Sequence, residues 1–337
     1  MHQTVAKRVI GYIRPHWKVI QWLCAAVAIY YAAKLLFGSR QSLEELLTLE
    51  PARLGILWLL VLAYYACHAF RYLMVLRTVS KTRLSFFRWF RIFMVGRFAN
   101  NILPQAGNAY RAIVLKSEIK LSFTKYIHVF ALFSWLDTLL NLIIALMVIV
   151  IVTPTLHVGG INATPAVSVI IVILIVTPIL VQWTLKRCHL TSRGGALLQA
   201  KVTGIFHALT TYGRRPKLVG NVSLWGIILF ALTMVIFKII FSALGIPIAA
   251  GQVALFIVVI RVTNLVMITP GNLGVRELLF GALAHTLKLG TAEGILACAL
   301  LRVANYMVLI PLGVAFGGWK LFGNAQKQQS DIITKGA

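Results

Sequence analysis

Acidic residues are scarce in this sequence. Among 337 residues there are 8 Asp and Glu against 33 Lys and Arg, so the formal net charge is +25. A charge of this size is common in proteins that bind nucleic acid. However, 59% of the residues are hydrophobic and the mean hydropathy is +0.86, which is too apolar for a soluble domain. The basic residues lie between the apolar runs, as the positive-inside rule predicts for an integral membrane protein, so we expect no nucleic-acid partner.

The sequence also lacks the motifs of common cofactor and metal sites. The Cys residues form no C-x-x-C pair, the His residues form no H-E-x-x-H motif, and no G-x-x-x-x-G-K-[ST] loop occurs. We therefore expect no metal, no cofactor and no ATP site, and we expect the Cys residues to be buried free thiols. His68, His128 and His285 are expected to pack in the interior or to line a pocket rather than to bind metal.

Apolar runs long enough to cross a bilayer recur along the chain. A spanning helix needs about 20 apolar residues, and the predicted spans cover residues 19–37, 54–76, 126–152, 166–183, 222–244 and 294–321. The segments 1–18, 77–91 and 184–220 are rich in Lys and Arg and are expected on the cytoplasmic side. The segment 153–165 contains neither residue and is expected outside. Both termini are then cytoplasmic, and an amphipathic helix is expected near 197–212.

Two apolar stretches are interrupted by helix-breaking residues. The stretch 260–280 contains the sequence Thr-Pro-Gly-Asn-Leu-Gly at 269–274, which cannot continue a regular helix. The earlier stretch 96–111 has the same order of features. Arg97, Asn100, Pro104, Gly107 and Arg111 parallel Arg261, Asn264, Pro270, Gly274 and Arg276, and Gly271 adds a second glycine to the later break. Similarity of this kind indicates an internal repeat.

These patterns predict an all-α polytopic membrane protein built as an inverted-topology repeat with two re-entrant helical hairpins. The arms of the first hairpin carry too many charges to cross about 30 Å of hydrocarbon, so that hairpin should return to the side it entered from. The first repeat is expected at 1–165 with a cytoplasm-facing hairpin at 84–121. The second is expected at 166–325 with an outward-facing hairpin at 253–289, followed by a cytoplasmic tail at 326–337.

Positive charges outnumber negative charges in the predicted interior. The interior cations are Arg97, Arg111, Arg261, Arg276 and Arg302, and the interior acids are Asp137 and Glu277. The excess calls for an anion, and a phosphate accepts bidentate Arg contacts well. Neutral hydrogen bonds would come from Asn100, Asn101, Asn264, Asn272 and Asn305. Alternatively, some Arg side chains reach an interface or pair with the two acids only to hold helices together; Arg302 is the expected partner of Glu277.

Three segments carry a family resemblance. They are Asn101-Ile-Leu-Pro104 with Gly107 and Arg111, Pro270-Gly-Asn-Leu-Gly-Val-Arg-Glu277, and Leu300-Leu-Arg302 with Tyr306. With them the chain resembles the transmembrane region of lysylphosphatidylglycerol synthase, the flippase half of the bacterial multiple peptide resistance factors. That family commonly has Gly at the position of Asn272. It often has a basic residue at the position of Gln105 and Glu at the position of Asn108. We expect a stand-alone member without the aminoacyl-transferase domain.

The resemblance implies a flippase that moves an anionic phospholipid or a lipid-linked intermediate in a bacterial or archaeal cytoplasmic membrane, and no enzymatic activity. The alternative is a membrane enzyme or accessory subunit acting on polyprenyl-phosphate or lipid-phosphate. Membrane lipids are the expected partners; a second copy of the chain and an envelope-synthesis enzyme stay open. The expected headgroup-binding residues are Arg97, Asn100, Asn101, Arg111, Asp137, Arg261, Asn264, Asn272, Arg276, Glu277, Arg302 and Tyr306, with breaks at Pro104, Gly107, Pro270, Gly271 and Gly274.

Overall fold

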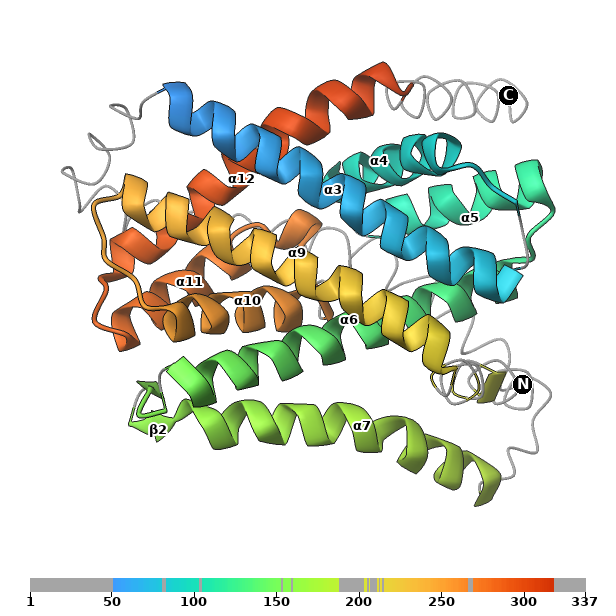
Figure 1. Cartoon of the computed structure of the whole chain (residues 1–337). Coiled ribbons are helices and arrows are strands. Elements are labelled where there is room, and N and C mark those ends of the chain that lie inside the picture. The colour runs from blue at the N-terminus through green and yellow to red at the C-terminus, as the bar shows by residue number, and fades with distance from the viewer. Residues whose placement is uncertain are drawn as a thin grey trace, which may run out of the picture.

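The chain folds into a bundle of helices in a computed structural model (Figure 1). The structure describes residues 51–80, 83–102, 105–152, 154–158, 160–187, 203–204, 206, 211, 213, 215–265 and 269–317. The predicted span at 19–37 and the tail at 326–337 lie outside the described residues, as does most of the helix expected at 197–212. The elements are α3 (Pro51–Ser80), α4 (Phe86–Ile102), α5 (Ala106–Ile119), α6 (Phe123–Val152), β1 (His157–Val158), β2 (Ile161–Asn162), α7 (Ala163–Arg187), α9 (Pro216–Ala243), α10 (Ala250–Leu265), the 3-10 turn η1 (Pro270–Asn272), α11 (Val275–Thr286) and α12 (Thr291–Ala315).

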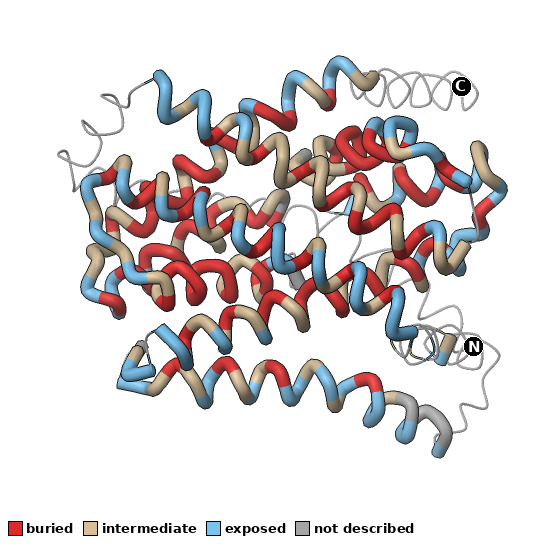
Figure 2. Tube along the Cα trace, viewed as in Figure 1, coloured by how far each residue is buried: buried red, intermediate tan, exposed pale blue. Residues whose placement is uncertain are grey.

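In the described part of the chain, five helices are long and apolar enough to cross a membrane: α3, α6, α7, α9 and α12. Each coincides with a span predicted from the sequence. Large apolar side chains are exposed along them, most continuously on α7, where Figure 2 shows a row of exposed and intermediate positions. Such a surface is stable in lipid rather than in water. The prediction of an all-α, polytopic membrane protein is therefore confirmed.

Two pairs of shorter helices form the predicted hairpins. The helices α4 and α5 have 17 and 14 residues, and α10 and α11 have 16 and 12. At about 1.5 Å per residue the longest of them reaches about 26 Å, less than the hydrocarbon thickness of about 30 Å. In Figure 1 the two pairs lie at opposite ends of the molecule, with α10 and α11 at the left and α4 and α5 at the right. This geometry suits arms that turn back inside the bundle.

The two halves pack on each other reciprocally. The helix α3 packs along α9, the first arm α10 of the second hairpin packs on α6, and the first arm α4 of the first hairpin packs on α12. The turn η1 also contacts α4. The two helix breaks therefore meet near the centre of the bundle, each held by the long helices of the other half.

Aromatic side chains fill the interior of the first half. Tyr72 of α3 stacks on Trp89 of α4 and contacts Phe133 of α6, with ring centroids 5.0 and 4.4 Å apart. The Trp89 indole donates a hydrogen bond to the Ala69 carbonyl oxygen at 2.8 Å, which satisfies its only polar atom. Phe93, one turn further along α4, is fully buried. This cluster fixes the face of α4 that carries Arg97.

Candidate functional site

The first hairpin is closed by two glycines. A Cβ on Gly107 would lie 1.7 Å from the Gly96 carbonyl oxygen, so the arms approach closely only because neither residue has a side chain. Asn100 bridges the break by accepting a hydrogen bond from the Gly107 backbone N–H at 2.7 Å. The close approach brings Arg97 and Arg111 together.

Arg97 and Arg111 lie against the same aromatic ring. Their guanidinium carbons are 5.2 and 5.4 Å from the centroid of Phe93. Arg111 is only 3% exposed. Cation–π contact offsets part of the cost of burying a guanidinium, but it supplies no hydrogen-bond acceptor.

The second hairpin is held by Arg302 of α12. This side chain donates hydrogen bonds to the carbonyl oxygens of Gly271 and Asn272 at 3.1 and 2.9 Å, and it forms an ion pair with Glu277. Gly271 has φ 56° and Gly274 has φ 77°, left-handed values that glycine adopts without strain. The ion pair expected between Glu277 and Arg302 is thus confirmed, and the broken backbone owes its shape to it.

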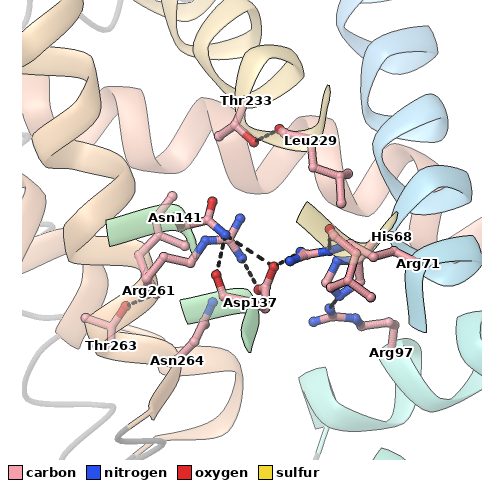
Figure 3. Close-up of polar contacts among 12 residues, drawn as sticks. His68, Arg71, Arg97, Asp137, Asn141, Leu229, Thr233, Arg261, Thr263 and Asn264 are labelled. Atoms are coloured by element: carbon pink, nitrogen blue, oxygen red, sulfur yellow. Dashed lines mark hydrogen bonds and ion pairs between the residues drawn. The ribbon is translucent and has the colours of Figure 1, made fainter. Parts of the chain in front are cut away.

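A third cluster joins three helices around Asp137 of α6 (Figure 3). The carboxylate pairs with Arg71 of α3 and, at 3.0 Å, with Arg261 of α10. Asn141, one turn along α6, donates to the same carboxylate at 3.2 Å. Arg71 is completely buried and Arg261 is 6% exposed, so this is a buried triad. Each cation depends on the single carboxylate for neutralisation.

The predicted residues line two adjoining cavities. The first has a volume of about 160 Å³, well above the roughly 10–15 Å³ that one water molecule requires. Of the predicted residues it is lined by Arg97, Asn100, Asn101, Arg261, Asn264, Asn272, Arg276, Arg302 and Tyr306, together with Gly271, Tyr64, Tyr65 and Asn305. It lies between the two breaks, and apolar side chains of α3, α9, α10 and α12 form the rest of its wall.

The second cavity has a volume of about 110 Å³. Of the headgroup-binding residues expected from the sequence, it is lined by Arg97, Asn100, Arg111, Asp137, Arg261 and Asn264. The two cavities share Arg97, Asn100, Arg261 and Asn264, which are the two copies of the Arg-x-x-Asn motif. The repeat noticed in the sequence therefore forms the wall between the cavities.

The arginines of the repeated features, Arg97, Arg111, Arg261 and Arg276, do not all line the same cavity. Arg111 lines only the second cavity and Arg276 lines only the first, because the second arms of the two hairpins lie on opposite sides of the shared wall. Glu277 lines neither cavity and acts through Arg302. Among the predicted breaks, Pro104 lies outside the described residues, Gly107 packs against α4, and Pro270 begins η1.

The interior arginines fall into two groups. Arg71, Arg261 and Arg302 form ion pairs with a carboxylate. Among the described residues no salt bridge is formed by Arg97, Arg111 or Arg276, and the Nε atom of each is buried without a hydrogen-bond partner. Arg97 contacts the His68 ring at 2.6 Å, and Arg276 donates to the Asn264 side chain at 2.9 Å. The cavities thus carry surplus positive charge with free donors.

The sequence reasoning missed one important residue, Arg71, and it gave His68 no role beyond packing or lining a pocket. Arg71 lies within the predicted span 54–76 and was not counted among the interior cations, although a lone Arg inside an apolar span is itself a signal. His68, expected only to pack or to line a pocket, lines the second cavity and contacts Arg97. The spacing of three residues places His68 and Arg71 on one face of α3, which the periodicity could have indicated.

One comparison with known proteins identifies the family of this chain. A family model described as the lysylphosphatidylglycerol synthase TM region matches residues 18–313, which is most of the chain. Neither a search of curated proteins nor a search of solved structures found a match. The matched region contains both hairpins, both cavities and all five long helices that the structure describes, apart from the last turn of α12. The protein therefore belongs to the lysylphosphatidylglycerol synthase transmembrane-region family, a family of membrane domains connected with lipid.

Proposed function

We propose that this protein moves an anionic lipid between the leaflets of the membrane, with the lipid phosphate bound by arginines in the central cavities. One observation carries the proposal. Within the described part of the chain, Arg97, Arg111 and Arg276 line the cavities and form no salt bridge, and the Nε–H of each is buried without a hydrogen-bond partner. Burying such charge in a membrane is costly on its own, roughly 2.5–3.5 kcal/mol for a central Arg. A bound anion would offset that cost.

A phosphate suits these donors better than other common anions. It accepts two parallel N–H bonds from one guanidinium, and its remaining oxygens can reach a second one. The side chains of Asn101, Asn305 and Tyr306 in the first cavity add neutral hydrogen-bond partners. A phosphate esterified to lipid can enter the cavity while its acyl chains stay in the bilayer, so the protein need not enclose the tails.

The arrangement of the cavities suggests a route. We place the first hairpin toward the cytoplasm and the second toward the outside. A headgroup in the second cavity would meet Arg97 and Arg111, and one in the first cavity would meet Arg97 and Arg276. The shared Arg-x-x-Asn wall would then be the point that the headgroup passes. Acid–base catalysis on a lipid-phosphate has less support, because Asp137 and Glu277 each already accept from arginine.

Transport of fluorescent lipids in oriented proteoliposomes tests the proposal. Wild-type protein should move an anionic lipid faster than a zwitterionic one. Arg97→Lys, Arg111→Lys and Arg276→Lys should each lower the rate about 10- to 100-fold, the equivalent of losing a charged hydrogen bond of about 1.5–3 kcal/mol. Arg111→Lys should mainly impair uptake from the inner leaflet, and Arg276→Lys exchange with the outer leaflet.

Arg88→Lys is the matched control. Arg88 has a 53% exposed side chain that pairs with Glu118 and lines neither cavity, so this variant should transport like wild type. The proposal fails if purified wild-type protein moves neither lipid class above empty liposomes. It also fails if all three cavity variants retain the wild-type rate.

A further inference from the structure

His68 holds an unusual position in the second cavity. The residue lies on α3, is 3% exposed, and its Nε2 atom is 2.6 Å from Nη2 of Arg97. The ring stacks on Tyr64 with centroids 5.7 Å apart. Phe93 and Phe133 pack on it at 5.5 and 5.3 Å. The ring is therefore locked by aromatic neighbours, and only its two nitrogens are available for polar contacts.

The contact with Arg97 determines the tautomer of the ring. A guanidinium is permanently charged and has donors only, so Nη2 donates and Nε2 must accept. A neutral imidazole that accepts at Nε2 carries its proton on Nδ1. Nδ1 of His68 is buried without a hydrogen-bond partner. The neutral ring thus offers one acceptor, which holds Arg97, and one unused donor.

Charged groups face this ring from every element that lines the second cavity with it. Arg97 comes from α4, Arg111 from α5, Asp137 from α6 and Arg261 from α10. On α3 itself, Tyr72 also lines the cavity, and Arg71 follows one turn after His68 and pairs with Asp137. Among the described residues, α9 and α12 contribute no lining residue to this cavity. Asp137 is the one carboxylate in this set, and two arginines already engage it.

We propose that His68 is the positioning residue of Arg97. Through the acceptor at Nε2, the ring holds the Arg97 guanidinium in the wall shared by the two cavities. Without that acceptor, Arg97 leaves the wall and lipid movement slows. The transport test of this inference rests on the proposed function. The tautomer of the His68 ring can be measured without transport and gives an independent test.

Three substitutions of His68 separate positioning from packing. In His68→Gln the amide oxygen reaches about where Nε2 lies and cannot titrate, whereas in His68→Asn it reaches only about as far as Nδ1. His68→Phe keeps the ring without an acceptor. The Gln variant should transport at close to the wild-type rate at neutral pH, while the Asn and Phe variants lose about tenfold, as for one charged hydrogen bond.

Rescue by Gln is the decisive transport measurement. His68→Gln keeps an acceptor about where Nε2 lies, so it should transport faster than the Asn and Phe variants. His285 is exposed at the end of α11 and lines neither cavity, so the sequence expectation that it packs in the interior or lines a pocket was wrong. His285→Gln and His285→Phe are therefore the matched controls and should keep the wild-type rate. A Gln variant as slow as the Phe variant would overturn the proposal, as would a Phe variant that transports at the wild-type rate.

Nitrogen NMR of the purified, ring-labelled wild-type protein decides the positioning without transport. The His68 signals, assigned by their loss in His68→Gln, should report a neutral ring protonated at Nδ1 at neutral pH. Arg97→Ala should abolish that preference. A ring protonated at Nε2 would overturn the inference. If wild-type protein moved no lipid but showed the Nδ1 tautomer, the proposed function would fail while the positioning of Arg97 by His68 would stand.

Discussion

The first hairpin, α4–α5, and the second hairpin, α10–η1–α11, carry the same Arg-x-x-Asn motif but place it in different surroundings. In the second hairpin, Arg261 pairs with Asp137. In the first, Arg97 meets the neutral ring of His68. The same residue type therefore forms an ion pair in one copy and, as far as the described residues go, none in the other.

The breaks differ in the same way. The second is tied by Arg302, which binds two backbone carbonyls and Glu277. The first is closed by the contact of Gly96 with Gly107 and by the side chain of Asn100. Within the described residues, the central ion pairs link the second hairpin with α6 and α12 and link α3 with α6, whereas Arg97 and Arg111 of the first hairpin form none. A structural repeat thus need not repeat its electrostatics.

Removing the carboxylate of Asp137 should have the largest effect on folding. Asp137→Asn leaves Arg71 and Arg261 buried without a counter-ion, and breaking a buried pair costs about 3–5 kcal/mol. Thermal unfolding in detergent should show a large fall in stability. Glu118→Gln is the control, because its partner Arg88 is half exposed and the loss should stay below about 1 kcal/mol. Equal losses in the two variants would mean that the triad does not hold the second hairpin.

Gly107→Ala should disrupt the first hairpin selectively. The added Cβ would lie 1.7 Å from a backbone oxygen that cannot move without the helix, so we expect a loss of about 3 kcal/mol, the upper range for overpacking. Transport should fall with it, since Arg97 and Arg111 would separate. In the comparison variant Gly220→Ala the new methyl group meets nothing within 4 Å. If Gly107→Ala behaved like Gly220→Ala, the close approach of α4 and α5 would be wrong.

Glu277→Gln tests the ion pair that ties the second break. It uncovers the positive charge of Arg302 but leaves that residue's two bonds to backbone carbonyls, so the expected cost is about 1–3 kcal/mol. The double variant Glu277→Gln, Arg302→Gln should lose less stability than the sum of the losses of the two single variants. Additive losses, measured by the same unfolding assay, would show that the pair contributes no coupling energy and that only the bonds to the backbone carbonyls hold the second break to α12.

Much of the fold could be predicted from the sequence, because the relevant signals are local. Long apolar runs marked α3, α6, α7, α9 and α12, and Pro with Gly marked the two breaks. Lipid leaves few options for a chain whose backbone polar groups must be satisfied internally, so hydropathy translates directly into helices. The surplus of arginine over acid was likewise visible in composition alone.

Apart from the Glu277–Arg302 pair, which was expected from the sequence, the pairing of those charges was decided by tertiary structure. Arg71 and Arg261 lie 66 and 124 residues from Asp137, and Glu277 lies 25 residues from Arg302. Which arginine obtains a carboxylate depends on which helices become neighbours, and the reciprocal packing of the two halves brings α3 and α10 to α6. The sequence by itself determined that the interior holds more positive than negative charge. Only the packing decided that, among the described residues, Arg97, Arg111 and Arg276 are interior cations that form no ion pair, because ion pairs act over a few ångströms and the residues that form them here are far apart along the chain.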